Sequence, residues 1–259
     1  MQRLSFSVCL AVVVIAAVSI GSLKAVSAET VKVAFTTSAP PYTFANKAGE
    51  VSGREGIWVD VYREALAFRG HTLVPRYIPY NRFGLELESG RIDGVSLLQD
   101  GLPPLFASAD AIHFKNYVFG HPGVTWELRS LDDLAGRSLV SWQGARGDLG
   151  ERFAEVSKSL RYYKEIGDQV RQVMIFLGKR VELTIVDTSI FRYVARIKGF
   201  DPNQYIPYDI IGGVIRFPAG FASEKIRNDF NEGLEHLKST GRYEAIYDYY
   251  INEYSGDAS

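Results

Sequence analysis

The sequence has little cysteine and no excess of charge of either sign. Its 259 residues include one cysteine, Cys9, and the 29 basic and 30 acidic side chains give a formal net charge of −1. One cysteine cannot form an intramolecular disulfide, which excludes the small disulfide-stabilised class of exported domains. The balanced charge, without a run of Lys or Arg, gives no indication of a nucleic-acid partner.

Motifs for metal binding and for nucleophilic catalysis are also missing. The four histidines, His71, His113, His121 and His236, do not have the spacing of metal ligands. No Gly-x-Ser-x-Gly motif occurs, and the one cysteine lies in an apolar N-terminal stretch. We therefore expect no metal, no cofactor and no enzymatic activity.

The N-terminal segment has the organisation of a secretory signal peptide. The chain begins with one positive charge, at Arg3, followed by an apolar stretch over 4–23 and the tripeptide Val-Ser-Ala at 26–28. We expect residues 1–28 to be a signal peptide that directs the protein to the periplasm. An uncleaved anchor helix is the alternative, because about 20 apolar residues can span a bilayer.

Strand and helix patterns alternate along the rest of the chain. Short apolar or alternating runs predict strands over 31–35, 71–78, 92–98, 137–142, 161–163, 181–186 and near 213–215. Apolar residues at helical spacing predict helices over 57–68, 81–89, 144–160, 169–177, 189–198, 223–239 and 243–250, with a helical turn at 130–134. This alternation predicts an α/β fold built twice, with crossover helices and a ligand site in the cleft between two halves.

Six short motifs, taken in order, resemble the polar-amino-acid class of periplasmic solute-binding proteins, solute-binding protein family 3. The motifs are PPYTF at 40–44, GIWVD at 56–60, LESGRID at 87–93, LDDLAG at 131–136, LGKRVE at 177–182 and GRYEAIY at 241–247. Each motif alone is weak, but their order and spacing extend over essentially the whole chain after the signal peptide. The resemblance implies a two-lobed clamshell of the type II periplasmic-binding-protein kind, each lobe a mainly parallel sheet flanked by helices.

The resemblance also implies where the lobes divide and what the protein does. Lobe one is expected to comprise 29–119 and 213–259, and lobe two 120–212, with crossings near 119–122 and 209–212. We expect a monomer that binds a small polar molecule, an amino acid or a related amine or organic acid, and presents it to an ABC permease.

Two other functions remain open for a chain of this kind. One is a sensing module that reports ligand occupancy to a membrane receptor. The other is an enzyme similar to cyclohexadienyl dehydratase, but such relatives carry an acid shortly after the Asp187 position, and 188–191 reads Thr-Ser-Ile-Phe.

Aromatic and acidic residues at strand ends are the first ligand-binding candidates. Tyr42 and Phe44 follow the first predicted strand, where open α/β sheets bind ligands, and similar proteins cover the ligand with an aromatic ring there. Asp187 follows the strand 181–186, and in the resembling family this acid holds an amine. Core packing is the alternative for the aromatic residues, and capping of the next helix is the alternative for Asp187.

The turn from strand to helix at 143–146 supplies further candidates. In the resembling family a Gly-Thr-Thr-like turn here holds a carboxylate, whereas this chain reads Gly144-Ala145-Arg146. Gly144 and Arg146 are therefore candidates, with Gln143 as a weaker one. Trp142 is expected in the core like Trp58, with a place in the cleft as its alternative.

One departure from the family pattern bears on the ligand. Amino-acid-binding members carry an Arg about twelve residues after the Asp93 position, which clamps the α-carboxylate, and this chain has Leu105 there. Either Arg82 or Arg146 replaces that anchor, or the ligand is not an α-amino acid.

Overall fold

The computed structural model describes residues 28–37, 39–46, 48–98 and 101–254. The expected signal peptide, 1–28, lies outside these residues except for Ala28. No helix among the described residues is both long enough and apolar enough to cross a membrane.

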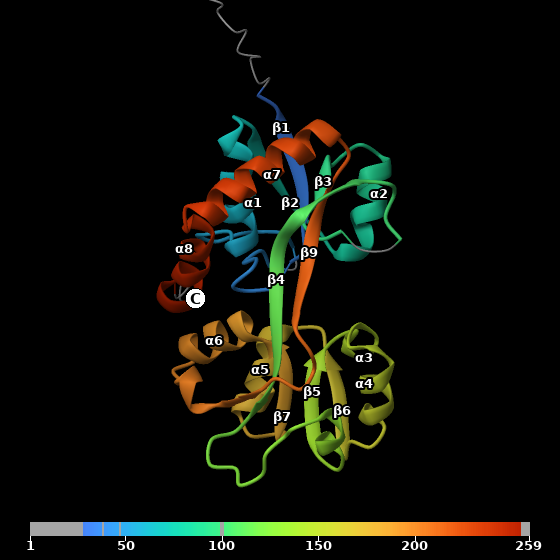
Figure 1. Ribbon diagram of the computed structural model, residues 1–259, viewed down its shortest axis with the longest axis vertical. Helices are drawn as coiled ribbons and strands as arrows, with labels where there is room; N and C mark the ends of the chain where they lie inside the picture. Colours follow the sequence, from blue (N-terminus) through green and yellow to red (C-terminus); the bar gives the residue numbers. More distant parts are fainter. Residues whose placement is uncertain (1–27, 38, 47, 99–100, 255–259) are drawn as a thin grey trace, which may run out of the picture.

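Two lobes are joined by two long strands that lie side by side (Figure 1). These strands, β4 (Phe106–Gly120) and β9 (Val214–Phe221), are antiparallel to each other. The described strands follow the order β2-β1-β3-β9-β4-β7-β5-β6, with β8 (Ile206–Tyr208) paired to β4. Up to Lys115, β4 pairs with β9, and from Asn116 it pairs with β7 and β8. The chain therefore enters the second sheet between Lys115 and Asn116.

The first lobe is a short parallel sheet covered by helices (Figure 1). Its strands are β1 (Thr30–Phe35), β2 (Thr72–Tyr77) and β3 (Gly94–Val95), with β1 parallel to both of the others. Its helices are α1 (Ile57–Phe68), η1 (Tyr80–Arg82), α2 (Phe83–Glu88), α7 (Glu224–Ser239), α8 (Arg242–Asp248) and the π-helical turn η4 (Tyr249–Glu253). Along β1, burial alternates at first and then becomes continuous, as expected for a strand covered on both faces.

The second lobe repeats this plan. Its parallel strands are β5 (Ser138–Trp142), β6 (Tyr162–Ile166) and β7 (Leu183–Asp187). Its helices are η2 (Leu131–Leu134), α3 (Ala145–Asp148), α4 (Gly150–Ser157), α5 (Gln169–Leu177), α6 (Thr188–Ile197) and η3 (Pro202–Gln204). Asp168 and Asp187 cap α5 and α6 by accepting hydrogen bonds from backbone N–H groups of the first turn. The two-lobed α/β fold is the one predicted from the sequence.

Several local predictions differ from the structure, among them the unpredicted short strand β8. The predicted helix over 144–160 is divided into α3 and α4, because Gly150 has a φ of 81°, outside the helical region. The predicted strand over 92–98 is reduced to Gly94–Val95. The long strand β4 was not predicted, since its pairing with β9 is irregular between Ala107 and Ile112 and its outer half is largely exposed.

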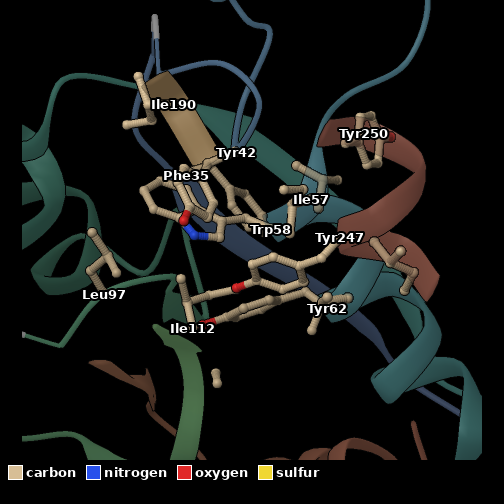
Figure 2. Close-up of a cluster of buried hydrophobic side chains, with 14 of the residues drawn as sticks. Phe35, Tyr42, Ile57, Trp58, Tyr62, Leu97, Ile112, Ile190, Tyr247 and Tyr250 are labelled. Carbon is tan, nitrogen blue, oxygen red and sulfur yellow. The ribbon is translucent and has the colours of Figure 1, made fainter. Parts of the chain in front are cut away.

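The main hydrophobic core continues from one lobe into the other. It includes Phe35 and Trp58 of lobe one together with Ile190 and Phe191 of α6 in lobe two. Figure 2 shows Ile190 in the same cluster of buried side chains as Tyr42 and Trp58 of the first lobe. The lobes therefore share buried surface beside the crossing strands.

The contact between α1 and α7 depends on a glycine. A Cβ atom on Gly233 of α7 would overlap the backbone carbonyl of Ala65 in α1. We expect Gly233→Ala to lower the free energy of unfolding by about 2 kcal/mol, because one helix must shift. Urea unfolding measures the change. Gly147→Ala in α3 is the matched control, since nothing lies within 4 Å of its added Cβ. Equal stability of the two variants would contradict the close approach of α1 and α7.

Candidate functional site

A cleft lies between the lobes, where both lobes and the crossing strands meet. It consists of two adjoining cavities of about 690 and 730 Å³, and both are lined by Phe114, Trp142, Gln169 and Ile190. Cavities of this size suit a small molecule. We call their combined space the cleft.

Aromatic side chains form much of the wall of the cleft. Trp58 and Tyr80 come from lobe one, Trp142 from lobe two, and Phe114 and Phe217 from β4 and β9. The ring of Phe114 lies edge-on to the rings of Trp58 and Phe217, with centroids 5.9 and 5.6 Å apart. The cleft therefore offers flat apolar area from both lobes.

The charged residues of the cleft wall are few. The 730 Å³ cavity is lined by no charged residue of the described chain, and the 690 Å³ cavity is lined by Asp148, Asp187 and Arg216. Arg216 alternates along β9 with Ile215 and Phe217, and its Nε lies 3.8 Å from a carboxylate oxygen of Asp110. Successive side chains of a strand point to opposite faces, so the guanidinium is directed away from the face that carries Phe217.

Asp187 is a buried carboxylate that joins three segments of the chain. Its Oδ1 accepts hydrogen bonds from the Tyr42 hydroxyl (3.0 Å) and from the N–H groups of Ser189 (2.8 Å) and Ile190 (3.1 Å). Its Oδ2 accepts one from the Lys115 N–H (2.8 Å). Burial raises the pKa of Asp187 to about 6, although the hydrogen bonds act in the opposite direction. Asp187 is thus a helix cap and also part of the cleft wall.

Asp148 is the second carboxylate of the cleft and is held by a neighbouring tryptophan. The indole Nε1 of Trp142 donates a hydrogen bond of 2.8 Å to Asp148 Oδ2. Trp142 ends β5 and Asp148 ends α3, so the bond spans the turn between these elements. It fixes an aromatic face and a carboxylate next to each other in the same wall.

The turn between β5 and α3 binds an internal carboxylate. Glu165 of β6 accepts hydrogen bonds from the N–H groups of Gly144 (2.9 Å) and Arg146 (3.0 Å) and from the Tyr163 hydroxyl (2.9 Å). Burial raises the pKa of Glu165, but these hydrogen bonds outweigh it and the net shift is downward. The N–H groups that the family resemblance assigns to a ligand carboxylate are therefore paired with Glu165. The sequence analysis missed Glu165, because the contact joins a turn residue and a strand residue that are 21 positions apart.

Three of the seven residues predicted to bind the ligand line the cleft. Gln143 and Gly144 line the 730 Å³ cavity, and Asp187 lines the 690 Å³ cavity. Trp142 lines both, in agreement with the alternative to its core placement, while Trp58 is both core and cleft wall.

The other four predicted residues lie elsewhere. Tyr42 is fully buried and contacts Asp187. Phe44 packs against the rings of Tyr193, Tyr250 and Tyr254.

The two predicted arginine anchors also have other contacts. Arg82 is 57% exposed, with a guanidinium nitrogen 3.5 Å from a Glu86 carboxylate oxygen. The guanidinium of Arg146 lies over the ring of Tyr163, 5.0 Å from its centroid. Neither arginine is among the residues that line the two cavities.

Further cleft residues were missed by the sequence analysis. Phe114 and Asn116 belong to β4, which the pattern did not reveal. Gln169 begins the correctly predicted helix α5, and its position directly after a strand-to-helix turn was a usable signal.

Neither a protein-family model nor a curated protein sequence matches this chain. Solved structures do match its fold. Substrate-binding domain 2 of Lactococcus lactis GlnP in the open conformation is 18% identical, with a TM-score of 0.63, covering 87% of this chain and 96% of that one. A histidine kinase sensor domain with similarity to periplasmic binding proteins is 20% identical, with a TM-score of 0.60 and coverages of 86% and 96%.

A third similar structure comes from an enzyme lineage. It is an ancestral amino acid-binding protein described as a precursor of cyclohexadienyl dehydratase, 14% identical, with a TM-score of 0.62 and coverages of 86% and 95%. At these identities the likeness establishes the fold, which is the two-lobed fold of periplasmic binding proteins. The same fold serves a transporter domain, a sensor domain and an enzyme precursor, so the function must be argued from the cleft.

The hydrogen bond from Tyr42 to Asp187 links a loop of lobe one to the end of β7 in lobe two. We expect Tyr42→Phe to lower the free energy of unfolding by about 1–2 kcal/mol, because a buried carboxylate loses a hydroxyl donor while the ring remains. Urea unfolding measures this loss. Tyr162→Phe, at a 46% exposed site, is the control and should change little. Equal stability of both variants and the parent protein would contradict a structural role for the bond.

The pKa of Asp187 predicts a pH dependence of stability. The pKa is about 6 in the folded protein, against an ordinary value of 3.8, so the folded protein holds this proton more tightly than the unfolded chain. The associated stability is fully present below about pH 4 and is lost as the pH rises through about 6, a loss of about 3 kcal/mol. Asp187→Asn lacks this ionisation. Wild-type stability relative to Asp187→Asn should fall between about pH 4 and about pH 7 in urea titrations. A constant difference would show that the pKa is ordinary.

Proposed function

We propose that this protein captures a small molecule between its lobes and presents it to a membrane partner. The observation that supports this proposal is that two adjoining cavities are walled by both lobes and by the strands that join them. In this proposal the chain is exported to the periplasm, acts as a monomer and has an ABC permease as its partner.

Closure follows from the way the walls are built. A ligand that contacts Tyr80 on lobe one and Trp142 on lobe two gains contacts as the lobes approach, so binding shifts the equilibrium towards the closed form. The crossing strands are suited to act as a hinge. β4 changes its pairing partner after Lys115, and Gly212 and Gly213, just before β9, have φ values of 80° and 73°. Such glycines allow a change in backbone direction at low cost.

Within the cleft, Gln143, Gly144 and Asp187 are proposed to contact the ligand. Tyr42 acts through Asp187 as a positioning residue, because its hydroxyl fixes the orientation of the carboxylate. The aromatic walls at Phe114 and Trp142 provide the apolar contact area.

The proposal includes no reaction on the ligand. The segment after Asp187 carries no acid, and Asp187 itself is occupied by four hydrogen bonds. The sensing role differs from the transport role only in the partner that recognises the closed form. Co-purification with a permease or with a receptor kinase distinguishes the two.

The test combines ligand screening with solution scattering on residues 29–259. A bound ligand at about one hundred times its Kd should raise the melting temperature by about 5–10 °C and reduce the radius of gyration as the lobes close. Mass spectrometry should recover the ligand unchanged. Trp142→Ala should abolish the shift, while Tyr162→Ala, on the surface of lobe two, should preserve it.

Two results would contradict the proposed function. An unchanged radius of gyration at saturation would remove the closure mechanism. Consumption of the ligand by the wild-type protein would identify an enzyme instead.

A further inference from the structure

We propose that the ligand is a small organic cation without a carboxylate, an amine or a guanidine, held between aromatic rings and the carboxylate of Asp148. This inference rests on the proposed function, since it names the class of ligand for the same cleft. The inference follows from the charged side chains that line the cleft and from the hydrogen bonds and ion pairs that these groups already form.

Two of the three charged residues that line the 690 Å³ cavity are the carboxylates Asp148 and Asp187, and the third is Arg216. No ion pair forms at Asp148 or Asp187 among the described residues. Arg216, the basic residue in the wall, pairs with Asp110 on the other face of β9. A cationic ligand would supply the missing charge, and lobe closure would strengthen its attraction to the carboxylates by excluding water.

Asp148 is positioned to accept a hydrogen bond from the ligand. Trp142 Nε1 donates to its Oδ2, and its Oδ1 has no protein partner within the described chain because the side chain is exposed at the cleft. Asp187 contributes its charge more than its lone pairs, because its Oδ1 already accepts three hydrogen bonds. A charge-assisted hydrogen bond from an ammonium or guanidinium group to Asp148 is the expected polar anchor.

The aromatic walls favour the same charge. Ring faces attract cations, and tryptophan does so most strongly. Trp58, Phe114 and Trp142 line the 730 Å³ cavity, where no charged residue of the described chain competes. The rings of Phe114 and Trp142 can contact an organic cation while the adjoining carboxylates balance its charge, and Trp58, only 2% exposed, packs behind Phe114.

A ligand carboxylate finds no comparable site in the cleft. The N–H groups of Gly144 and Arg146 are bound by the Glu165 carboxylate, and the guanidinium of Arg146 lies on Tyr163. An anion near Asp148 would be repelled, and an anion at the turn would have to displace Glu165. Glu165 thereby acts against carboxylate ligands and is a specificity-determining residue.

The experiment compares compounds that share a skeleton and differ in charged groups. One series is tyramine, tyrosine and 3-(4-hydroxyphenyl)propionate, and the other is agmatine, arginine and 4-guanidinobutyrate. Binding is measured by calorimetry at about pH 7.5, where a carboxyl with a pKa near 6 is ionised. We expect at least one of the two amines without a carboxylate to bind at least about tenfold more tightly than its carboxylate-bearing analogues.

Matched variants test which charges carry the selectivity. Asp148→Asn should weaken binding of the preferred amine about tenfold. Glu155→Gln removes the same charge from a 66% exposed side chain on α4 and should leave affinity unchanged. Arg82→Ala and Arg146→Ala should also leave it unchanged. Unfolding curves of each variant confirm that it is folded.

Several outcomes would overturn the inference. Tighter binding of the carboxylate-bearing analogue in both series would overturn the proposed ligand class. The proposed function would remain intact, because the protein would still capture a ligand. Unchanged affinity of Asp148→Asn for the preferred amine would also overturn the inference. Loss of amine binding in Arg146→Ala would overturn it as well. Absence of binding by every member of both series would reject this ligand class. The wider screen and scattering experiment would then decide separately whether the protein binds ligands at all.

Discussion

The carboxylate of Asp187 is the point on which the arrangement of the two lobes depends. It accepts hydrogen bonds from β4, from the first turn of α6 and from the Tyr42 hydroxyl of lobe one. These four donors fix the end of β7 against the crossing strand and against the loop after β1. A buried carboxylate is costly unless it is well hydrogen-bonded, so the geometry around it is strongly constrained. The raised pKa records that the hydrogen bonds offset the cost of burial only in part.

This junction determines the form of the cleft. Because β4 passes from one sheet to the other beside Asp187, its Phe114 faces the cleft just before the change of pairing partner and Asn116 just after it. The same junction fixes the start of α6, where Ile190 enters both the shared core and the cleft wall. A ligand that contacts Phe114 or Ile190 therefore touches the region where the two lobes join, about which the proposed closure would turn. In this way binding in the cleft can be coupled to closure without a separate mechanical element.

The sequence predicted most of the fold and part of the site. Helices with strong apolar spacing and a cap or glycine at the end, such as α1 and α5, have the predicted bounds. β4 was missed because it lacks a regular pattern, and with it the central ring of the cleft, Phe114, was missed too. For Asp187 the capping and cleft interpretations both hold, since a strand end in such a sheet is also the start of a helix. Pattern analysis cannot find Glu165, whose role depends on pairing between β5 and β6 rather than on local sequence.

Two departures from the resembling family point to the same chemistry, although they lie in different lobes. Lobe one has Leu105 at the position where the family resemblance implies a carboxylate-clamping Arg. Lobe two has the N–H groups of Gly144 and Arg146 bound by Glu165, which the structure alone shows. Either change alone could be compensated from the opposite lobe, because one strong anion site suffices to hold a carboxylate. With both present, neither of these two anion sites is available within the described chain. The charged side chains that line the cleft there are Asp148, Asp187 and Arg216, and Arg216 pairs with Asp110. The leucine at position 105 and the binding of the turn's N–H groups by Glu165 both remove a site for a ligand carboxylate. Both are thus consistent with a cleft that binds a positively charged ligand.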